Sequence, residues 1–296
     1  MRAFIPFFML AIIIIICCAE KSENKSDLKA DIQSLIQSQD WDIAVAFEDL
    51  KTNDSFFLNH KKLMHAASTM KTPVMIEVFK QANKGKFSMD DSLMIRNEFK
   101  SIVDSSKYSL SMDEDMNDRV YAHIGQTMTI RELVREMITV SNNLATNILV
   151  ELVGAQNIMK TMNDIGAHDI RVLRGVEDIK AYRAGLNNVT TAYDLYLVMR
   201  AIASRQIVDE SSSEEMMKIL MEQIYVEKIP ALLPDSVKVA NKTGHITRID
   251  HDSAILVVNG EPRYIMVVLT KGIVAHNEAK RIISHISKLV YDYHAG

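Results

Sequence analysis

A serine followed three residues later by a lysine is the first pattern in this chain that can do chemistry. It occurs three times, at Ser22 and Lys25, at Ser26 and Lys29, and at Ser68 and Lys71. Only the third pair begins a predicted amphipathic helix, which runs from residue 68 to residue 82. Residues three apart on a helix share one face, so we expect the Lys71 amine to reach the Ser68 hydroxyl. Because a serine hydroxyl is a poor nucleophile until a base activates it, this pair predicts nucleophilic catalysis at Ser68.

The run Ser141-Asn142-Asn143 directly follows a predicted helix over residues 129–138. The Ser141 hydroxyl can relay a proton to a leaving nitrogen. Alternatively, Ser141 only caps the next predicted helix, residues 144–153, and for this serine taken alone capping is the better interpretation.

The run Lys242-Thr243-Gly244 lies at the end of a predicted strand over residues 237–241. An ammonium and a hydroxyl on a strand edge beside a glycine suit a substrate carboxylate docked along that strand. An ordinary strand-end turn is the alternative. The three patterns in this order, each in a suitable structural context, are far more specific than any one of them.

Helical and strand segments occupy different parts of the chain. Strands are predicted at residues 41–50, 237–242, 254–259 and 264–270. Helices are predicted over residues 28–36, through most of residues 66–220, and over residues 277–293. This separation favours an α+β chain whose first and last pieces share one sheet. We predict a sheet domain of residues 28–66 and 218–296, with a helical domain of residues 67–217 inserted in it.

The composition excludes several classes of protein. The 34 Lys and Arg against 38 Asp and Glu give a net charge of -4, which argues against nucleic-acid binding. Hydrophobic residues make up 48% of the chain, so a large core is expected. The nine histidines are scattered, and both cysteines, Cys17 and Cys18, end the apolar N-terminal run. We therefore predict no metal site and no cofactor.

Residues 1–18 are predicted to be a signal peptide, because their apolar stretch is too short to span a bilayer. Polar residues 19–27 follow as a tether, and a cysteine before such a tether resembles a bacterial lipoprotein signal. Either Cys17 or Cys18 is a candidate for lipidation. We expect an exported monomer that is periplasmic or touches the membrane only through a lipid anchor. A buried N-terminal strand or an uncleaved anchor is the less favoured alternative.

The three motifs together resemble those of the class A β-lactamases and the wider superfamily of penicillin-recognising serine enzymes. The resemblance covers nearly the whole chain after residue 27, with matching runs at residues 67–71, 128–133, 141–143 and 242–244. It implies a two-domain β-lactamase-like fold, in which helices flank an antiparallel sheet and an all-helical domain is inserted.

The resemblance also implies roles for the motif residues. Ser68 is the residue to be acylated and Lys71 its activating base, while Ser141 shuttles a proton and Asn143 positions the substrate side chain. Lys242, Thr243 and Gly244 form the strand that binds the substrate carboxylate. The backbone N–H groups of Ser68 and His245 form the oxyanion hole, where the start of the Ser68 helix adds unpaired donors.

The loop after Arg174 departs from the family pattern. The family places there a glutamate that activates the deacylating water, with an asparagine four residues later. A gap-free alignment puts Val176 and Lys180 at these two places, and Glu177 comes one residue late. A local slip would bring Glu177 into the site opposite Ala181, so we predict slow deacylation. A solvated acidic loop is an equally good interpretation.

The family often holds the substrate carboxylate with an arginine beyond the lysine strand, and the nearest candidates here are Arg248 and His251. His251 falls at the usual strand position, where it would bind a carboxylate only when protonated. A histidine that is hydrogen-bonded between strands is the slightly favoured alternative. The stretch of residues 97–118 is longer than usual and is expected to overhang the cleft.

The leading prediction is an exported serine hydrolase that forms an acyl-enzyme with β-lactams and hydrolyses it. Within the enzymes, the alternative is a D,D-peptidase or another amide or ester hydrolase that acts on a small substrate resembling a peptidoglycan peptide. A sensor domain that is acylated once and keeps the product is the alternative outside the enzymes. A purely structural role is the least favoured, because it leaves the Ser68, Lys71, Ser141 and Lys242 set unexplained.

Overall fold

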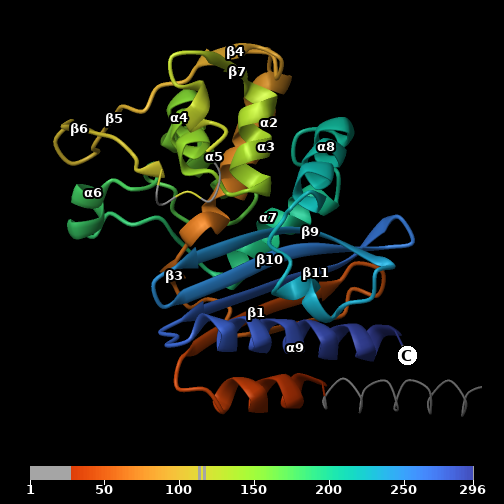
Figure 1. The fold of residues 1–296 in the computed structure, drawn as a ribbon. Helices are drawn as coiled ribbons and strands as arrows, with labels where there is room; N and C mark the ends of the chain where they lie inside the picture. The colour runs from red at the N-terminus through yellow and green to blue at the C-terminus, as the bar shows by residue number, and fades with distance from the viewer. Residues whose placement is uncertain (1–27, 113–114, 116–117, 296) are drawn as a thin grey trace, which may run out of the picture.

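The computed structural model describes residues 28–112, 115 and 118–295 (Figure 1). The predicted signal peptide, the two candidates for lipidation, Cys17 and Cys18, and the predicted tether lie outside the described residues. Among the described residues, no helix has both the length and the apolar character needed to cross a bilayer.

A five-stranded antiparallel sheet joins the two ends of the described chain, in the order β2-β1-β11-β10-β9. Its strands are β1 (Asp42–Asp49), β2 (Ser55–Leu58), β9 (Val237–Ile246), β10 (Ile249–Val258) and β11 (Glu261–Lys271). Strand β1 pairs with β11, so early and late residues share one sheet. The α+β prediction is thereby confirmed, and the strands fall within the two ranges predicted for the sheet domain.

The alternation of side chains along β1 explains how the sheet is covered on both faces. Ile43, Val45 and Phe47 belong to one apolar cluster, together with residues of the helix over 28–37 and of α9 (His276–Ala295). Ala44 and Ala46 point the other way, into a larger cluster shared with the helical half. Figure 1 shows α9 and the first helix below the sheet and the other helices above it.

The helical half stands on the second face of the sheet. Its helices are α2 (Lys71–Asn83), α3 (Ile130–Thr139), α4 (Asn143–Val153), α5 (Ala155–Asp164), α6 (Ile179–Arg183), α7 (Ala192–Ala203) and α8 (Glu210–Met221). The short 3-10 turns are η1 (Ala67–Met70), η3 (Tyr121–His123) and η4 (Ile229–Leu232). Helix α7 packs on β1, β10 and β11, while η1 packs on β9.

Two predictions about the elements were too coarse. The stretch between residues 66 and 220 is not almost all helix, because short strand pairs interrupt it: β3 (Met64–His65) with β8 (Val189–Thr190), β4 (Ser92–Met94) with β7 (Thr127–Thr129), and β5 (Phe99–Lys100) with β6 (Lys107–Tyr108). Strand β9 does not end at residue 242 but continues to Ile246. It continues because Lys242, Thr243 and Gly244 pair with Ser253, Asp252 and His251 of β10.

The cover over the lower face predicts a matched pair of stability effects. Ile283 of α9 is fully buried in the cluster below the sheet. Its replacement by alanine is expected to lower the free energy of unfolding by about 2–5 kcal/mol, since it leaves a cavity. The exposed neighbour Arg281 on the same helix serves as control, and its alanine variant is expected to change stability by less than about 0.5 kcal/mol. Equal effects in urea unfolding would contradict this account of the sheet's cover.

Candidate active site

Ser68 lies in η1, the turn that leads directly into α2, and its side chain is half-buried. It lines a pocket of about 300 Å³ together with four other residues singled out from the sequence: Ser141, Asn143, Thr243 and His245. A Cβ on Gly244 would come within 3.1 Å of Ala67 Cβ and 3.2 Å of Thr69 Cγ2. A glycine is therefore needed where β9 packs against the turn that carries Ser68.

Lys71, the first residue of α2, is fully buried, and its amine points toward the start of α4. Its Nζ donates to the Ser141 carbonyl at 2.5 Å, to Asn143 Oδ1 at 2.8 Å and to Ser141 Oγ at 3.2 Å. Among the described residues, Ser68 is not a hydrogen-bond partner of the Lys71 amine, although the two residues lie three positions apart at the start of the helix. The Lys71 amine is thus held by the predicted proton relay, Ser141, and by Asn143.

Burial lowers the pKa of Lys71 to about 7, because the charged amine loses its hydration. The nearby carboxylates of Asp115 and Glu177 act in the opposite direction and stabilise the charged form. An amine with this pKa is neutral in a large fraction of molecules near pH 7, so Lys71 can accept a proton there.

Ser141 stands between two lysines in a left-handed backbone conformation, with φ of 60°. Its Oγ accepts hydrogen bonds from Lys71 at 3.2 Å and from Lys242 at 3.0 Å. Both lone pairs are thereby used, which leaves the hydroxyl hydrogen for an acceptor in the pocket. The interpretation of Ser141 as a helix cap is wrong, since the cap of α4 is Asn142, whose side chain accepts from the Ala145 N–H at 2.8 Å.

Lys242 lies within β9 and is also fully buried. Its Nζ donates to Ser141 Oγ at 3.0 Å and to the Thr243 carbonyl at 3.0 Å. Burial holds the pKa of Lys242 well below its usual range, and the neighbouring amines of Lys71 and Lys228 lower it further. The run Lys242-Thr243-Gly244 is thus part of the sheet and not a turn at the end of a strand.

Glu177 faces the site, although it comes one residue later than the family pattern. Its backbone is left-handed, with φ of 61°, and its Oε1 accepts from Asn143 Nδ2 at 2.8 Å. Asp178 is buried and caps α6 through the Ala181 N–H at 3.0 Å. The interpretation of these two acids as a solvated loop is therefore wrong.

The residues flanking Glu177 show what the altered loop lacks. The backbone of Val176 is held by Asn147, which accepts from its N–H at 2.6 Å and donates to its carbonyl at 3.0 Å. Lys180 is exposed and pairs with Asp104 at 3.0 Å, and Ala181 is buried with an apolar side chain. Neither supplies the amide that the family places opposite the glutamate. Asn143 of α4 is the observed amide partner of Glu177.

Arg248 and His251 do not take the place of the family's arginine, and neither is among the described residues that line the pocket. Arg248 lies in the β9-β10 turn, where its guanidinium donates to the Gly272 carbonyl at 3.1 Å. His251 is fully buried; its Nδ1 accepts from the Thr270 N–H at 3.1 Å and its Nε2 lies 2.9 Å from the His65 carbonyl. Burial lowers the pKa of His251 to about 4. It is neutral at physiological pH, so the proposed substrate-binding role of His251 is wrong, and the favoured alternative of a histidine hydrogen-bonded between strands is confirmed.

Sequence reasoning missed five charged residues that line the pocket: Asp115, Glu227, Lys228, Asp250 and Lys280. Asp115 accepts from the Asn143 N–H at 2.8 Å at the start of α4. The buried Lys228 lies 2.7 Å from Asp250 Oδ1 and donates to the carbonyls of Gly244 and His251. For Asp115 the sequence offered one signal, the unusual length of the stretch of residues 97–118 in which it lies. Lys228 and Asp250 had none, because only the fold brings η4, β9 and β10 together.

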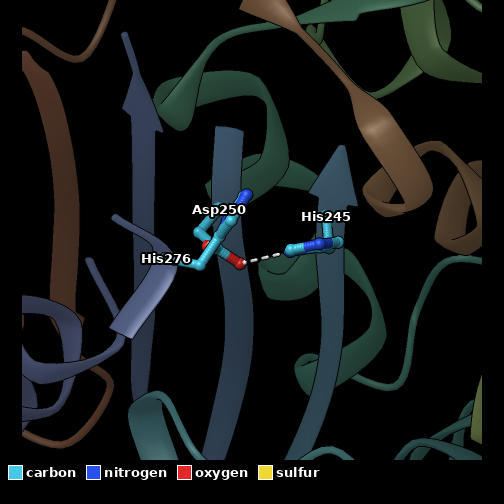
Figure 2. A group of neighbouring side chains, drawn as sticks. All are labelled: His245, Asp250 and His276. Carbon is cyan, nitrogen blue, oxygen red and sulfur yellow. Dashed lines mark hydrogen bonds and ion pairs between the residues drawn. The ribbon is translucent and has the colours of Figure 1, made fainter. Parts of the chain in front are cut away.

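Asp250 also contacts two histidines from different elements. His245 Nδ1 lies 3.1 Å from Asp250 Oδ1, and His276 Nδ1 lies 2.5 Å from Asp250 Oδ2 (Figure 2). Within the described part of the chain, this is the group of side chains whose donor atoms could together hold a metal ion.

Comparison with known proteins agrees with this geometry. The profile of the Beta-lactamase enzyme family matches residues 27–294. The β-lactamase VEB-1 of Pseudomonas aeruginosa is 22% identical over 286 residues, which cover 90% of each chain. A crystal structure of a β-lactamase from Sphaerobacter thermophilus has 19% identity and a TM-score of 0.76, over 90% of this chain and 96% of that one. A mutant of PBP-A, in an acyl-enzyme complex with penicillin G, has 22% identity and a TM-score of 0.78, over 91% and 97%.

The chain belongs to the β-lactamase enzyme family, since the match spans nearly all of the described residues. It is a serine hydrolase of the class A type. The resemblance drawn from the three motifs is thereby confirmed, and the structural likeness confirms the β-lactamase-like fold.

The electrostatics of Lys71 can be measured directly. In protein carrying ¹³C-labelled lysine, the NMR signal of Lys71, assigned with Lys71→Met, is expected to titrate near pH 7. Asp115→Asn removes a charge that stabilises the ammonium and is expected to lower this pKa further. Glu98→Gln, at an exposed ion pair with Lys107, is the control and is expected to leave the pKa unchanged. A Lys71 signal that titrates only above pH 9 would contradict the account.

Proposed function

We propose that this protein forms an acyl-enzyme at Ser68 with β-lactam antibiotics and hydrolyses it. The observation that carries the proposal is the buried Lys71 amine, with a pKa of about 7, which lies against Ser141 while Ser68 opens into the same pocket. Export to the periplasm or to a membrane-tethered position is part of the proposal, and the N-terminal sequence supports it.

Acylation requires a base, a proton donor and a site for negative charge. The neutral Lys71 amine takes the proton of Ser68 as Ser68 Oγ attacks the lactam carbonyl and the carbonyl C–N bond breaks. Ser141, with both lone pairs engaged by lysines, donates its proton to the departing nitrogen and recovers one from the lysines. The N–H groups of Ser68 and His245 are the proposed oxyanion donors.

The strand β9 supplies the proposed docking surface for the substrate. Thr243 lines the pocket, and the amine of the buried Lys242 donates to Ser141 Oγ, which also lines it. These two residues are the proposed partners of the substrate carboxylate. Asn143 is the proposed contact for the substrate side chain, and it also holds Glu177.

Deacylation is the step in which the altered loop matters most. Glu177 is the proposed base for the hydrolytic water, because its carboxylate is anchored by Asn143 and its charge acts on Lys71. A water held by one carboxylate without the usual amide opposite is poorly positioned, so this step is proposed to limit turnover.

The second candidate is an enzyme of the D,D-peptidase type, in which the β-lactam acyl-enzyme persists. The specific observation in its favour is that Lys180 pairs with Asp104 and Ala181 is apolar, so neither assists Glu177. A sensor that keeps the acyl group would share this feature.

Intact mass spectrometry separates these candidates. Protein mixed with penicillin G is expected to gain the mass of the drug and to lose it again as the drug is hydrolysed. Ser68→Ala is expected to remove the adduct, while Ser204→Ala, at an exposed helix end, is expected to behave as the wild type. A lasting adduct would favour the second candidate. Labelling of Ser68→Ala would contradict the assignment of the nucleophile.

Glu177→Gln tests the deacylation step by itself. This variant keeps an acceptor for Asn143 but cannot accept a proton, so the adduct is expected to form and then to persist. The loss of a general base typically slows a step by about 10²–10⁴-fold. Rapid-quench mass spectrometry measures the decay, with Glu98→Gln as the control. An unchanged decay rate would remove Glu177 from the mechanism.

A further inference from the structure

We propose that His245, Asp250 and His276 form a three-residue binding site for Zn²⁺ on the wall of the active-site pocket. The three residues come from three elements: β9, β10 and the first residue of α9. Figure 2 shows the three side chains close together, with a dashed line that joins the Asp250 carboxylate to His245. The sequence predicted no metal site, because His245 and His276 are 31 positions apart and belong to no common motif.

The donor set suits zinc. Two imidazoles and one carboxylate are ligands that Zn²⁺ binds in sites with three protein ligands and an open fourth position. Their ligand atoms all lie within 4.8 Å of one another. In a tetrahedral zinc site with bonds of about 2.0–2.1 Å, two ligand atoms are about 3.3 Å apart. His276 Nδ1 lies 2.5 Å from Asp250 Oδ2, so these two atoms must move apart to share one ion.

The site is partly preformed because its carboxylate is fixed and its imidazoles are accessible. Asp250 is fully buried, and its Oδ1 lies 2.7 Å from Lys228 Nζ and 3.1 Å from His245 Nδ1. The His245 side chain is 58% exposed and that of His276 is 36% exposed. Their rings lie 4.1 Å apart between centroids. Rotation of the exposed His245 side chain and the half-buried His276 side chain is the movement that shared binding of one ion requires.

Lys228 determines which oxygen of Asp250 is available. Its Nζ lies 2.7 Å from Oδ1, so this oxygen already has a cation beside it. Oδ2 faces His276 Nδ1 at 2.5 Å and is the oxygen that we assign to the metal. The Lys228 charge weakens the affinity for a cation. Of the other charged residues on the pocket, Glu227 is paired with Lys280 at 3.2 Å, which leaves Asp115 as the carboxylate that favours a cation there.

The position of the site connects it to the active site. His245 and Asp250 line the pocket into which Ser68 opens. An ion held there would have its fourth coordination position next to this pocket, where water or a substrate carboxylate can reach it. The binding of zinc itself does not rest on the proposed hydrolase activity.

Isothermal titration calorimetry with Zn²⁺ alone tests the proposal. Full-length protein, stripped with chelator and dialysed at pH 7.5, is expected to bind one equivalent of Zn²⁺. His245→Ala and His276→Ala are each expected to weaken binding by about tenfold or more, since each removes a ligand. His168→Ala is the control, because this exposed histidine contacts Asn163 and lies outside the group. Thermal melting of each variant without zinc verifies that it is folded.

Each outcome decides the question. One equivalent bound by the wild type and by His168→Ala, with weak binding by both variants of the group, supports the site. The absence of binding overturns it. Binding of several weak equivalents that is the same in all four proteins also overturns it, because scattered surface histidines would then account for the signal. If the wild type binds zinc but is acylated by penicillin neither with nor without the metal, the proposed hydrolase fails while the zinc site stands.

Discussion

Two lysine amines, Lys71 and Lys242, are fully buried and donate to the same hydroxyl, that of Ser141. Burying an ammonium group is expensive, so burial lowers the pKa of both lysines, and the charge of Lys71 lowers the pKa of Lys242 further. The hydroxyl and carbonyl oxygens around them offset only part of this cost. The fold therefore leaves the Lys71 amine neutral in a large fraction of molecules near pH 7, where a free lysine would be charged.

This arrangement depends on three segments that are distant in the sequence. The η1 turn and α2 bring Ser68 and Lys71, the residues before α4 bring Ser141 and Asn143, and β9 brings Lys242. Gly244 lets β9 approach the η1 turn closely, and the capping of α4 by Asn142 leaves Ser141 free to turn its hydroxyl toward the lysines. The sheet acts as the rigid base, because β9 is held by β10 along ten paired residues.

Much of this could be predicted from the sequence, because the chemistry is carried by short motifs and the fold by periodicity. The order of the three motifs and the bracketing strands predicted the family and the fold class, which the comparison confirms. The role of Ser141 could not be settled in this way, since a serine before a helix is usually a cap. Its left-handed backbone, with φ of 60°, is visible only in the structure.

Other parts of the site were beyond sequence reasoning because they are tertiary. The alignment placed His251 at the position of a charge-bearing residue, but its side chain is buried, contacts the backbone of His65 in β3 and Thr270 in β11, and stays neutral. Lys228 and Asp250 form a buried ion pair that no spacing rule signals. The contact of Glu177 with Asn143 depends on one left-handed residue in an irregular loop, and such loops have no periodic pattern.

The central claim is that the buried amine of Lys71 is the base for acylation. The pH dependence of the single-turnover rate of acylation by penicillin tests it most directly. Since the neutral form of Lys71 is the active one, the rate is predicted to rise with pH and to level off, with an apparent pKa of about 7. A rate that is flat through this range, or that continues to rise above pH 9, would contradict the account.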